Sequence, residues 1–303
     1  MLGDKFIGRM ICIVCSLLII GETAKASAIP SELKKTVVFL YVDKDANLIP
    51  YGTGFFVGVK HPNDPNVFTP YLVTAKHVIS KPNSTEYFDK IFLRLNKTDG
   101  GSEILMLPIA PDGNNKRVFV HNDPSVDIAV IPCLPNENKF DFLVFPDEYL
   151  TTKEEYKNLK ISEGSEVFFT GLFTPYLGAE KNYPVVRFGR VALVADEKIL
   201  FNGKQQDLYL IEAGSYGGNS GSPVFFCVRR DELEPGKLFL SGSSFYRLAG
   251  IMEGTFLDAR EIKVIETKSI PIAQSNMGIA AVVPSYKLRE ILFSDELRKK
   301  RGF

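Results

Sequence analysis

The stretch Gly217-Gly218-Asn219-Ser220-Gly221-Ser222-Pro223, followed at once by Val224-Phe225-Phe226, decides how the rest of the chain is interpreted. A tight, glycine-rich turn before an apolar strand can expose a serine hydroxyl and aim backbone N–H groups at a developing oxyanion. The same composition is also common in loops that only connect strands. Whether Ser220 is a nucleophile therefore depends on finding a base and an acid elsewhere in the chain.

The chain has three histidines, and a serine hydroxyl needs such a base to react at neutral pH. His61 and His121 stand in turn-like segments that contain proline, which favours surface loops. His77 follows the apolar run 71–76 and precedes Val78-Ile79, so we expect it at the end of a buried strand. A core histidine bonded to backbone groups is the alternative for this position.

An acid is needed to orient the histidine and to stabilise the imidazolium that forms. Asp127 is the one carboxylate at the head of the apolar segment 125–131. Because an unpaired buried carboxylate is costly, Asp127 should have a partner, either a histidine or a lysine, an arginine or backbone N–H groups. Asp123 is a weaker candidate because it lies in a proline turn that we expect to be solvated.

The chain order of these residues separates the classes of serine hydrolase. Every histidine precedes Ser220, which excludes the α/β-hydrolase order with its histidine last. An acid-first order, using Asp43, Asp45 or Asp64, would require an α/β pattern that the sequence lacks. The order histidine, acid, serine remains, and it is typical of proteases built from two β-barrels.

Short apolar, β-branched and aromatic segments separated by turn residues dominate the chain and predict an all-β fold. Candidate strands of a first run are 36–42, 54–59, 71–74, 91–95, 104–109, 118–120 and 126–131, and those of a second run are 167–171, 185–194, 208–212, 224–228, 246–252 and 277–283. Residues 153–159 are a short helical candidate. Only 285–300 has the apolar spacing of an amphipathic helix, with Ser285 as its expected cap.

We therefore predict two six-stranded antiparallel β-barrels followed by a C-terminal helix. The expected boundaries are 29–135 for the first barrel with His77 and Asp127, 136–165 for the connection, 166–284 for the second barrel with Ser220, and 285–303 for the helix.

Five segments in this order resemble motifs of the chymotrypsin-like (trypsin-like) serine peptidases. They are Thr74-Ala75-Lys76-His77-Val78, Asp127-Ile128-Ala129-Val130, Gly218-Asn219-Ser220-Gly221-Ser222-Pro223, and, as in bacterial HtrA-type members, Tyr51-Gly52-Thr53-Gly54-Phe55-Phe56-Val57 and Gly278-Ile279-Ala280-Ala281-Val282-Val283-Pro284-Ser285. The resemblance implies a two-barrel fold and a catalytic triad of His77, Asp127 and Ser220.

The resemblance also implies roles for further residues. The N–H groups of Gly218 and Ser220 would form the oxyanion hole, and the strand from Ile251 through Glu253 to Gly254 would pair with substrate. Gly214 would lie near the base of the primary specificity pocket. Because a glycine supplies no charge there, we expect a preference for small or medium apolar side chains. The alternative is a preference for basic side chains, if the Glu253 carboxylate reaches this pocket.

The sequence also departs from the family pattern. Asn219 replaces the aspartate that binds a newly cut N-terminus in digestive members, so we do not expect zymogen activation of that kind. Glu253 stands near where many relatives have a small polar residue that supports the catalytic aspartate. No PDZ-sized segment follows the last motif, so regulated assembly of the HtrA kind is not expected either.

The N-terminus has the features of a secretory signal. Lys5 and Arg9 precede the apolar run 10–20, and Ala26-Ser27-Ala28 supplies the small residues required before a cut. The run is short for a bilayer span, which needs about 20 apolar residues. We expect cleavage after Ala28, a secreted or periplasmic protein, and no stable membrane insertion afterwards; an uncleaved anchor is the alternative.

Composition bounds the remaining possibilities. The 303 residues are 45% hydrophobic and carry 36 basic and 36 acidic side chains, so nothing indicates attraction to nucleic acid. Beyond the signal only Cys133 and Cys227 remain, and we expect buried apolar roles for both. No cofactor or metal is expected. Two functions are weighed, an exported serine endopeptidase acting on polypeptides and a catalytically weak or inactive peptide-binding module of the same fold.

Overall fold

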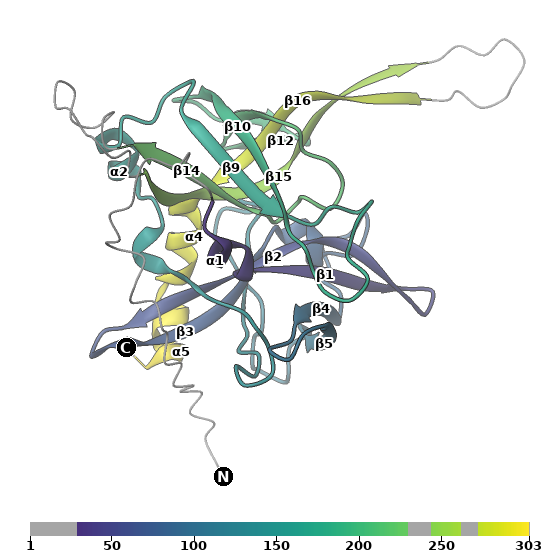
Figure 1. The fold of residues 1–303 in the computed structure, drawn as a ribbon. Coiled ribbons are helices and arrows are strands. Elements are labelled where there is room, and N and C mark those ends of the chain that lie inside the picture. Colours follow the sequence, from purple (N-terminus) through teal and green to yellow (C-terminus); the bar gives the residue numbers. More distant parts are fainter. Residues whose placement is uncertain (1–28, 230–243, 262–271, 303) are drawn as a thin grey trace, which may run out of the picture.

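The structure is a computed structural model that describes residues 29–229, 244–261 and 272–302. The expected signal peptide, residues 1–28, lies outside these residues. Two β-rich halves lie one above the other in Figure 1, and two C-terminal helices run beside both. Each half is formed by a continuous part of the chain: strands β1 to β8 belong to the first half, and the second half begins with β9.

The first half is an eight-stranded sheet with the order β5-β4-β1-β2-β3-β7-β6, and β8 pairs with β2. Its strands are β1 (Val37–Lys44), β2 (Asn47–His61), β3 (Asp64–Thr74), β4 (Lys90–Asn96), β5 (Ser102–Pro108), β6 (Phe119–Val120), β7 (Ala129–Pro132) and β8 (Phe145–Pro146). Six of the eight have four residues or more, whereas β6 and β8 have two each. The hydrogen-bonded path of this half is not closed, because its end strands β5 and β6 do not pair.

The second half is a closed antiparallel barrel with the order β10-β13-β16-β15-β14-β9. Its strands are β9 (Glu166–Gly171), β10 (Val185–Val194), β13 (Tyr209–Ala213), β14 (Pro223–Arg229), β15 (Ser244–Glu261) and β16 (Ile272–Pro284), and a separate hairpin is formed by β11 (Ile199–Phe201) and β12 (Lys204–Gln206). Beyond the barrel, β15 and β16 extend as a paired arm (Figure 1). A closed six-stranded barrel, a second sheet and short C-terminal helices confirm the predicted fold class.

The helical elements are short. They are α1 (Ser31–Lys35), η1 (Lys76–Ile79), η2 (Asp147–Tyr149), α2 (Lys153–Asn158), α4 (Ser285–Leu292) and α5 (Asp295–Arg301). The sequence predicted α2 but combined α4 and α5 into one helix. The break occurs because the Ser294 hydroxyl accepts a hydrogen bond from the Leu297 N–H and begins a new helix. The predicted cap at Ser285 is wrong, because its hydroxyl donates to the Thr151 carbonyl at 2.7 Å instead.

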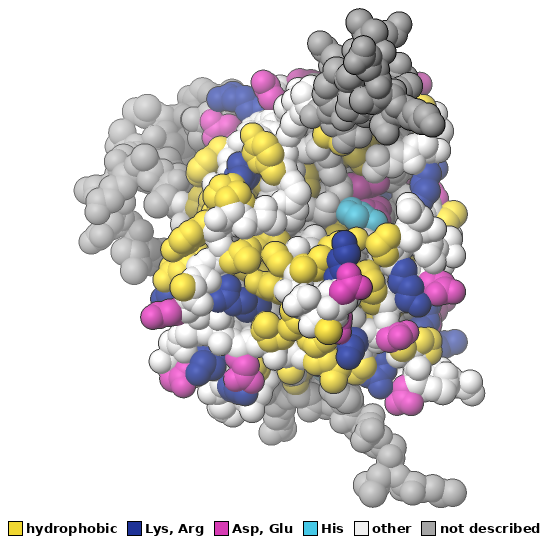
Figure 2. Space-filling model, turned by 90° about the vertical axis from the view of Figure 1, so that its right-hand side faces the viewer, with side chains coloured by type: hydrophobic (Ala, Val, Ile, Leu, Met, Phe, Trp, Pro, Cys, Tyr) yellow, Lys and Arg dark blue, Asp and Glu magenta, His cyan; other side chains and the backbone are white. Residues whose placement is uncertain are grey.

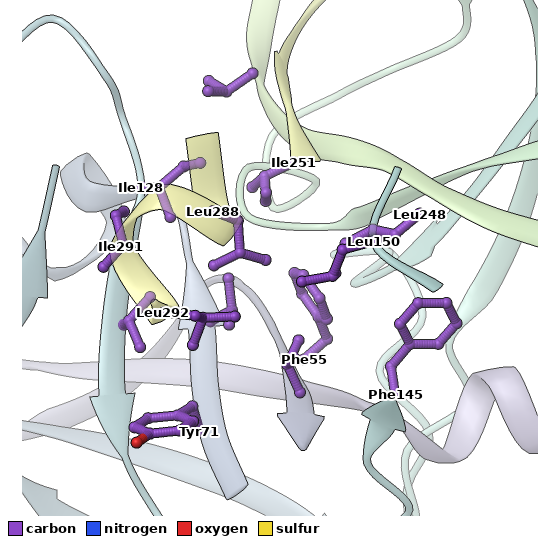
Figure 3. Close-up of a cluster of buried hydrophobic side chains, with 14 of the residues drawn as sticks. Phe55, Tyr71, Ile128, Phe145, Leu150, Leu248, Ile251, Leu288, Ile291 and Leu292 are labelled. Atoms are coloured by element: carbon purple, nitrogen blue, oxygen red, sulfur yellow. The ribbon is translucent and has the colours of Figure 1, made fainter. Parts of the chain in front are cut away.

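One hydrophobic core joins the two halves and the C-terminal helix (Figure 3). From the first half it includes Phe55, Tyr71 and Ile128, and from the second half Leu248 and Ile251. The apolar face of α4 closes one side of this core with three labelled side chains, Leu288, Ile291 and Leu292. Burying such side chains is worth about 2 kcal/mol each, so the core fixes the halves relative to each other. Of the two predicted apolar cysteines, Cys133 is buried and Cys227 is half-buried.

Candidate active site

Two paired strands of the first half bring His77 and Asp127 together. β3 ends at Thr74, and His77 follows in the short 3-10 helix η1. β7 begins at Ala129, two residues after Asp127, and Thr74 is the register partner of Ala129. His77 therefore follows the end of one strand, and Asp127 precedes the start of the neighbouring strand at the same edge. The sequence predicted this pairing from the chain order of His77, Asp127 and Ser220 and from the resemblance to trypsin-like peptidases.

Asp127 holds His77 by two hydrogen bonds. One carboxylate oxygen lies 2.5 Å from the ring nitrogen Nδ1, and the other accepts the backbone N–H of His77 at 2.9 Å. Asp127 is buried, whereas 48% of the His77 side chain is exposed. Figure 2 shows a face of the molecule on which a histidine side chain is visible at the surface, among side chains of several kinds. With Nδ1 engaged, the ring nitrogen Nε2 is left to exchange a proton with a reacting group.

The charges of the two residues support each other. Burial alone would lower the pKa of His77, but the hydrogen bond and negative charge of Asp127 outweigh it, and the pKa is raised above 6.5. Burial alone would raise the pKa of Asp127, but the hydrogen bonds and charge of His77 hold that pKa below its ordinary value. Asp127 therefore stays ionised at neutral pH and stabilises a protonated imidazole.

Lys76 anchors the segment that precedes the aspartate. Its Nζ donates to the carbonyls of Pro124 at 2.8 Å and Val126 at 2.9 Å. The alternative acid, Asp123, accepts hydrogen bonds from the N–H and hydroxyl of Ser125 within its own turn. Asp123 therefore contributes to this turn, and Asp127 is the acid bonded to His77. Sequence reasoning missed the role of Lys76, because a lysine beside a histidine gives no signal of its own.

The Ser220 turn requires its glycines. Gly218 and Gly221 have φ angles of +94° and +85°, in the left-handed region that favours glycine. A Cβ on Gly221 would lie 2.1 Å from the Thr53 carbonyl oxygen, so no other residue fits there without a shift of the backbone. The turn is thus packed directly against β2 of the other half.

Two N–H groups of this turn are available to an oxyanion. Within the described part of the chain, neither the Gly218 N–H nor the Ser220 N–H donates to another group. Asn219 holds the turn, because its side chain accepts the Tyr216 N–H at 2.9 Å and donates to the Leu172 carbonyl at 2.7 Å. A neutral amide therefore makes the local contacts that fix the predicted oxyanion donors.

The Ser220 hydroxyl points to its own half of the molecule. It donates to the backbone carbonyl of Glu253 at 3.1 Å, and among the described residues it has no hydrogen bond to His77. Catalytic hydrogen bonds are often long or misaligned without substrate and form only in the complex. The three residues of the predicted triad thus comprise one bonded pair and one serine that is not yet bonded to it.

Thr53 links the nucleophile turn to the first half, a role that sequence reasoning missed. Its N–H donates to the Ser220 carbonyl at 2.9 Å, and its hydroxyl donates to the Gly218 carbonyl at 2.7 Å. The same hydroxyl accepts the Leu172 N–H at 2.9 Å. A buried threonine flanked by Gly52 and Gly54 in an apolar strand was the available signal.

Glu253 lies beside the predicted triad. The residue is 5% exposed, and Oε1 accepts a hydrogen bond from Gln206 at 2.9 Å while Oε2 has no partner among the described residues. Burial, followed by the nearby charge of Asp127, raises the pKa of Glu253 to about 7. This carboxyl therefore interacts electrostatically with the histidine–aspartate pair, and its hydrogen bond is to the β11–β12 hairpin.

The predicted substrate strand needs one correction. Ile251 is fully buried and pairs with Pro223 on β14 and with Val283 on β16, so both of its backbone edges are occupied. Gly254 pairs with Ala281 on β16 alone, because β14 no longer runs alongside it. Only the part of β15 from Glu253 onward has a backbone edge for another chain. Including Ile251 among the substrate-binding residues was therefore wrong.

No group of three or more His, Cys, Asp or Glu side chains among the described residues is placed to hold a metal ion. None of the helices in residues 29–302 that the structure describes is both long and apolar enough to cross a bilayer.

Comparisons with known proteins identify the family of this chain. A family model described as the trypsin-like peptidase domain matches residues 52–228, which include His77, Asp127 and Ser220. No curated protein matches the chain. Similar solved structures include the apo MamO protease domain from Magnetospirillum magneticum, with 18% identity and a TM-score of 0.49, covering 87% of this chain and 98% of that chain. Rv3671c from M. tuberculosis H37Rv, an inactive serine-to-alanine mutant, has 18% identity and a TM-score of 0.39, covering 86% and 87%.

The family model spans more than half of the sequence and contains all three triad positions. The chain belongs to the trypsin-like peptidase family.

Proposed function

We propose that the chain is a serine endopeptidase that hydrolyses polypeptides through an acyl-enzyme on Ser220. One observation carries this proposal: Asp127 grips His77 through both Nδ1 and the backbone N–H, while the imidazole stays half-exposed. A core histidine would have no need of an exposed ring. A ring fixed by a carboxylate, with Nε2 free to accept a proton, is what a general base requires.

In the first step, His77 Nε2 takes the proton of the Ser220 hydroxyl as Oγ attacks the scissile carbonyl carbon. The carbonyl oxygen becomes an oxyanion, which the N–H groups of Gly218 and Ser220 are available to bind. Asp127 stabilises the imidazolium without taking its proton. Because the pKa of His77 is raised, the protonated ring is a favourable intermediate.

The tetrahedral intermediate collapses when His77 gives its proton to the leaving nitrogen and the carbon–nitrogen bond breaks. The acyl group then remains as an ester on Ser220. A water attacks this ester with His77 again as base, the ester bond breaks, and the proton returns to Ser220 Oγ. Two proton transfers in each half-reaction balance, and no other co-reactant is required.

An extended substrate can add a strand to the open edge of β15 from Glu253 onward. Its backbone N–H would then compete for the Glu253 carbonyl, which accepts the Ser220 hydroxyl in the free protein. Losing that acceptor frees the hydroxyl to turn toward His77. Substrate binding would therefore complete the triad.

Export is part of the proposal. Lys5 and Arg9, the apolar run 10–20 and the small residues 26–28 support a signal peptide removed after Ala28. The mature protein would act in the periplasm or outside the cell. N-terminal sequencing of the protein recovered from the exported fraction tests this, with Ile29 as the expected first residue and an intact Met1 as the contrary result.

A second candidate is a peptide-binding module without turnover. The observation that favours it is the bond of the Ser220 hydroxyl to Glu253 rather than to His77. Hydrolysis of an unstructured protein such as casein separates the two functions. The proposal expects cleavage that is lost in Ser220→Ala and in His77→Ala, whereas a binding module would retain casein on the wild-type protein without fragments.

A further inference from the structure

Arg187 on β10 has an unusual environment beside the nucleophile turn. Its guanidinium carbon lies 5.2 Å from the ring centroid of Phe173 and 5.0 Å from that of Tyr216. Phe173 follows β9, and Tyr216 belongs to the same turn as Ser220. The cation is thus held between two aromatic rings, an arrangement that fixes a guanidinium and removes part of its hydration.

The described residues place no anion beside this cation. Among them, the Arg187 side chain forms neither a hydrogen bond nor an ion pair, and its Nε is buried without a partner. Arg190, three positions along the same strand, shows the ordinary situation, because it is 64% exposed and faces Glu166 at 3.7 Å. Residues an odd number apart on a strand point to opposite faces, so the two arginines serve different surroundings. A partly desolvated guanidinium without a carboxylate is costly unless a ligand supplies one.

Gly214 leaves room next to the guanidinium. A Cβ built on Gly214 would lie 3.6 Å from the Tyr216 ring and 3.8 Å from Arg187 Nη1, which are ordinary contact distances. A Cβ on Gly217 would meet no atom within 4 Å. The loop therefore has glycine at two positions where a larger side chain would fill the space in front of the loop. One of them, Gly214, lies beside Arg187.

The same loop is fixed relative to both the nucleophile and the substrate edge. Tyr216 and Asn219 exchange two hydrogen bonds, and the Ser215 carbonyl accepts one from Asn276 on β16. β16 in turn pairs with the part of β15 that has an open edge. A substrate residue whose carbonyl meets Gly218 and Ser220 N–H therefore has its side chain within reach of the Gly214 loop.

We propose that Arg187, between Phe173 and Tyr216 and opposite Gly214, binds a carboxylate and selects Asp or Glu on the acyl side of the cut bond. This inference rests on the proposed peptidase function. A planar guanidinium can bind a carboxylate through two parallel hydrogen bonds, which favours an acid over its amide. The inference replaces the apolar preference expected from Gly214 alone, because the Arg187 guanidinium next to this glycine supplies a positive charge. It also replaces the basic preference expected from Glu253, whose carboxyl is bonded to Gln206.

Cleavage of matched peptides tests the selection. Four peptides would differ only in the residue before the cut bond, which is Glu, Gln, Leu or Lys. We expect Glu to give the highest kcat/KM, and Arg187→Gln to lower the Glu-to-Gln ratio of kcat/KM by about a hundredfold, the effect of removing one partner of a desolvated charge pair. Arg190→Gln is the control, and it should leave the ratio at the wild-type value.

The ratio also separates recognition from simple support of the turn. If Arg187 only supports the position of Tyr216, Arg187→Gln lowers kcat/KM for the Glu and Gln peptides equally, and the inference is overturned. A wild-type preference for Leu or Lys overturns it as well.

A binding measurement keeps the test independent of turnover. Fluorescence polarisation with the Ser220→Ala protein would compare the Glu and Gln peptides, before and after adding Arg187→Gln. Tighter binding of the Glu peptide that disappears in the double variant supports the carboxylate site. It does so even if the wild-type protein proves inactive, because inactivity would contradict only the proposed hydrolysis. Equal binding of both peptides contradicts the site whether or not the protein is an active peptidase.

Discussion

The two halves of the molecule contribute to the proposed active site in different states. In the first half, His77 and Asp127 are joined by two hydrogen bonds, and Lys76 anchors the aspartate segment. In the second half, the Ser220 hydroxyl donates to Glu253 of its own barrel. The proposed base is therefore fixed within one sheet, whereas the proposed nucleophile would have to turn toward it. Thr53 of the first half holds the turn that carries Ser220.

Removing either side of the triad should give the largest effect. Ser220→Ala or His77→Ala should lower kcat by several orders of magnitude, because the groups act as a unit. Asp127→Asn should be comparably damaging, since an amide at Nδ1 favours the wrong tautomer. Kinetics on casein or a peptide, with circular dichroism to verify folding, measure this.

Asp123→Asn is the matched control for the aspartate. Asp123 bonds within its own turn and to Lys198, and not to His77, so hydrolysis should change little. A large loss in Asp123→Asn with a small one in Asp127→Asn would show that the wrong acid has been assigned to the first half.

Thr53→Val attacks the contact between the halves while keeping the side-chain shape. The buried Leu172 N–H loses its acceptor and the Gly218 carbonyl loses its donor, which should destabilise the fold by about 2 kcal/mol. The turn that carries the oxyanion donors loosens, so kcat should fall while the His77–Asp127 pair is retained. Urea unfolding and steady-state kinetics measure the two effects, and Thr98→Val, at an exposed threonine, is the control. Wild-type kcat in Thr53→Val would mean that the turn is held by its own half.

Glu253→Gln should shift the pH dependence that the two halves share. The acid limb of kcat/KM should lie above pH 6.5, because the pKa of His77 is raised. Part of that rise comes from the negative charge of Glu253, so the variant should move the limb to lower pH. A limb that does not move, in profiles from pH 5 to 9, would show that Glu253 carries no charge near His77.

The same variant should change how stability depends on pH. The pKa of Glu253 in the folded protein is about 7, above its ordinary 4.5, so the folded state binds the proton more tightly. Its contribution to stability therefore falls as the pH rises from about 4.5 through about 7. The Tm of Glu253→Gln should exceed that of wild type more at pH 8 than at pH 5, and an equal difference at both pH values would contradict a buried, strained carboxyl.

The smallest effect is expected for the surface ion pair between the halves. Lys198, just before β11, lies 3.2 Å from Asp123 of the first half, and the two side chains are 46% and 30% exposed. Lys198→Ala should cost less than about 1 kcal/mol, since such pairs are screened by water. Thermal unfolding at low and high salt measures it. A larger loss would mean that this pair contributes more to the contact between the halves than a screened surface pair does.

The sequence predicted what local patterns encode. His77, Asp127 and Ser220 each stand at an end of an apolar strand, and their chain order excluded other serine hydrolase arrangements. The break between α4 and α5 was also encoded, since Ser294 precedes two acidic residues as helix caps do, but the apolar spacing through Leu297 hid it. The short strands β8, β11 and β12 were missed because two or three residues give no periodicity.

Other features depend on contacts between distant segments. Thr53 meets Gly218 and Leu172 only after the two halves pack, and no spacing in the sequence encodes that. Ile251 was predicted to bind substrate because it lies on a correctly predicted strand. The register, however, places Ile251 between two neighbouring strands. Arg187 stands between apolar residues, as charged residues in many strands do. Only the fold brings aromatic rings to both sides of its guanidinium.

Covalent labelling tests most directly whether Ser220 is activated by His77 across the two halves. Wild-type protein would be treated with a fluorophosphonate probe, and the adduct located by peptide mass spectrometry. We predict one adduct, on Ser220, that is absent in Ser220→Ala and His77→Ala and that forms faster as the pH rises through the titration of His77. Failure of folded wild-type protein to react, or equal labelling of His77→Ala, would contradict the catalytic account.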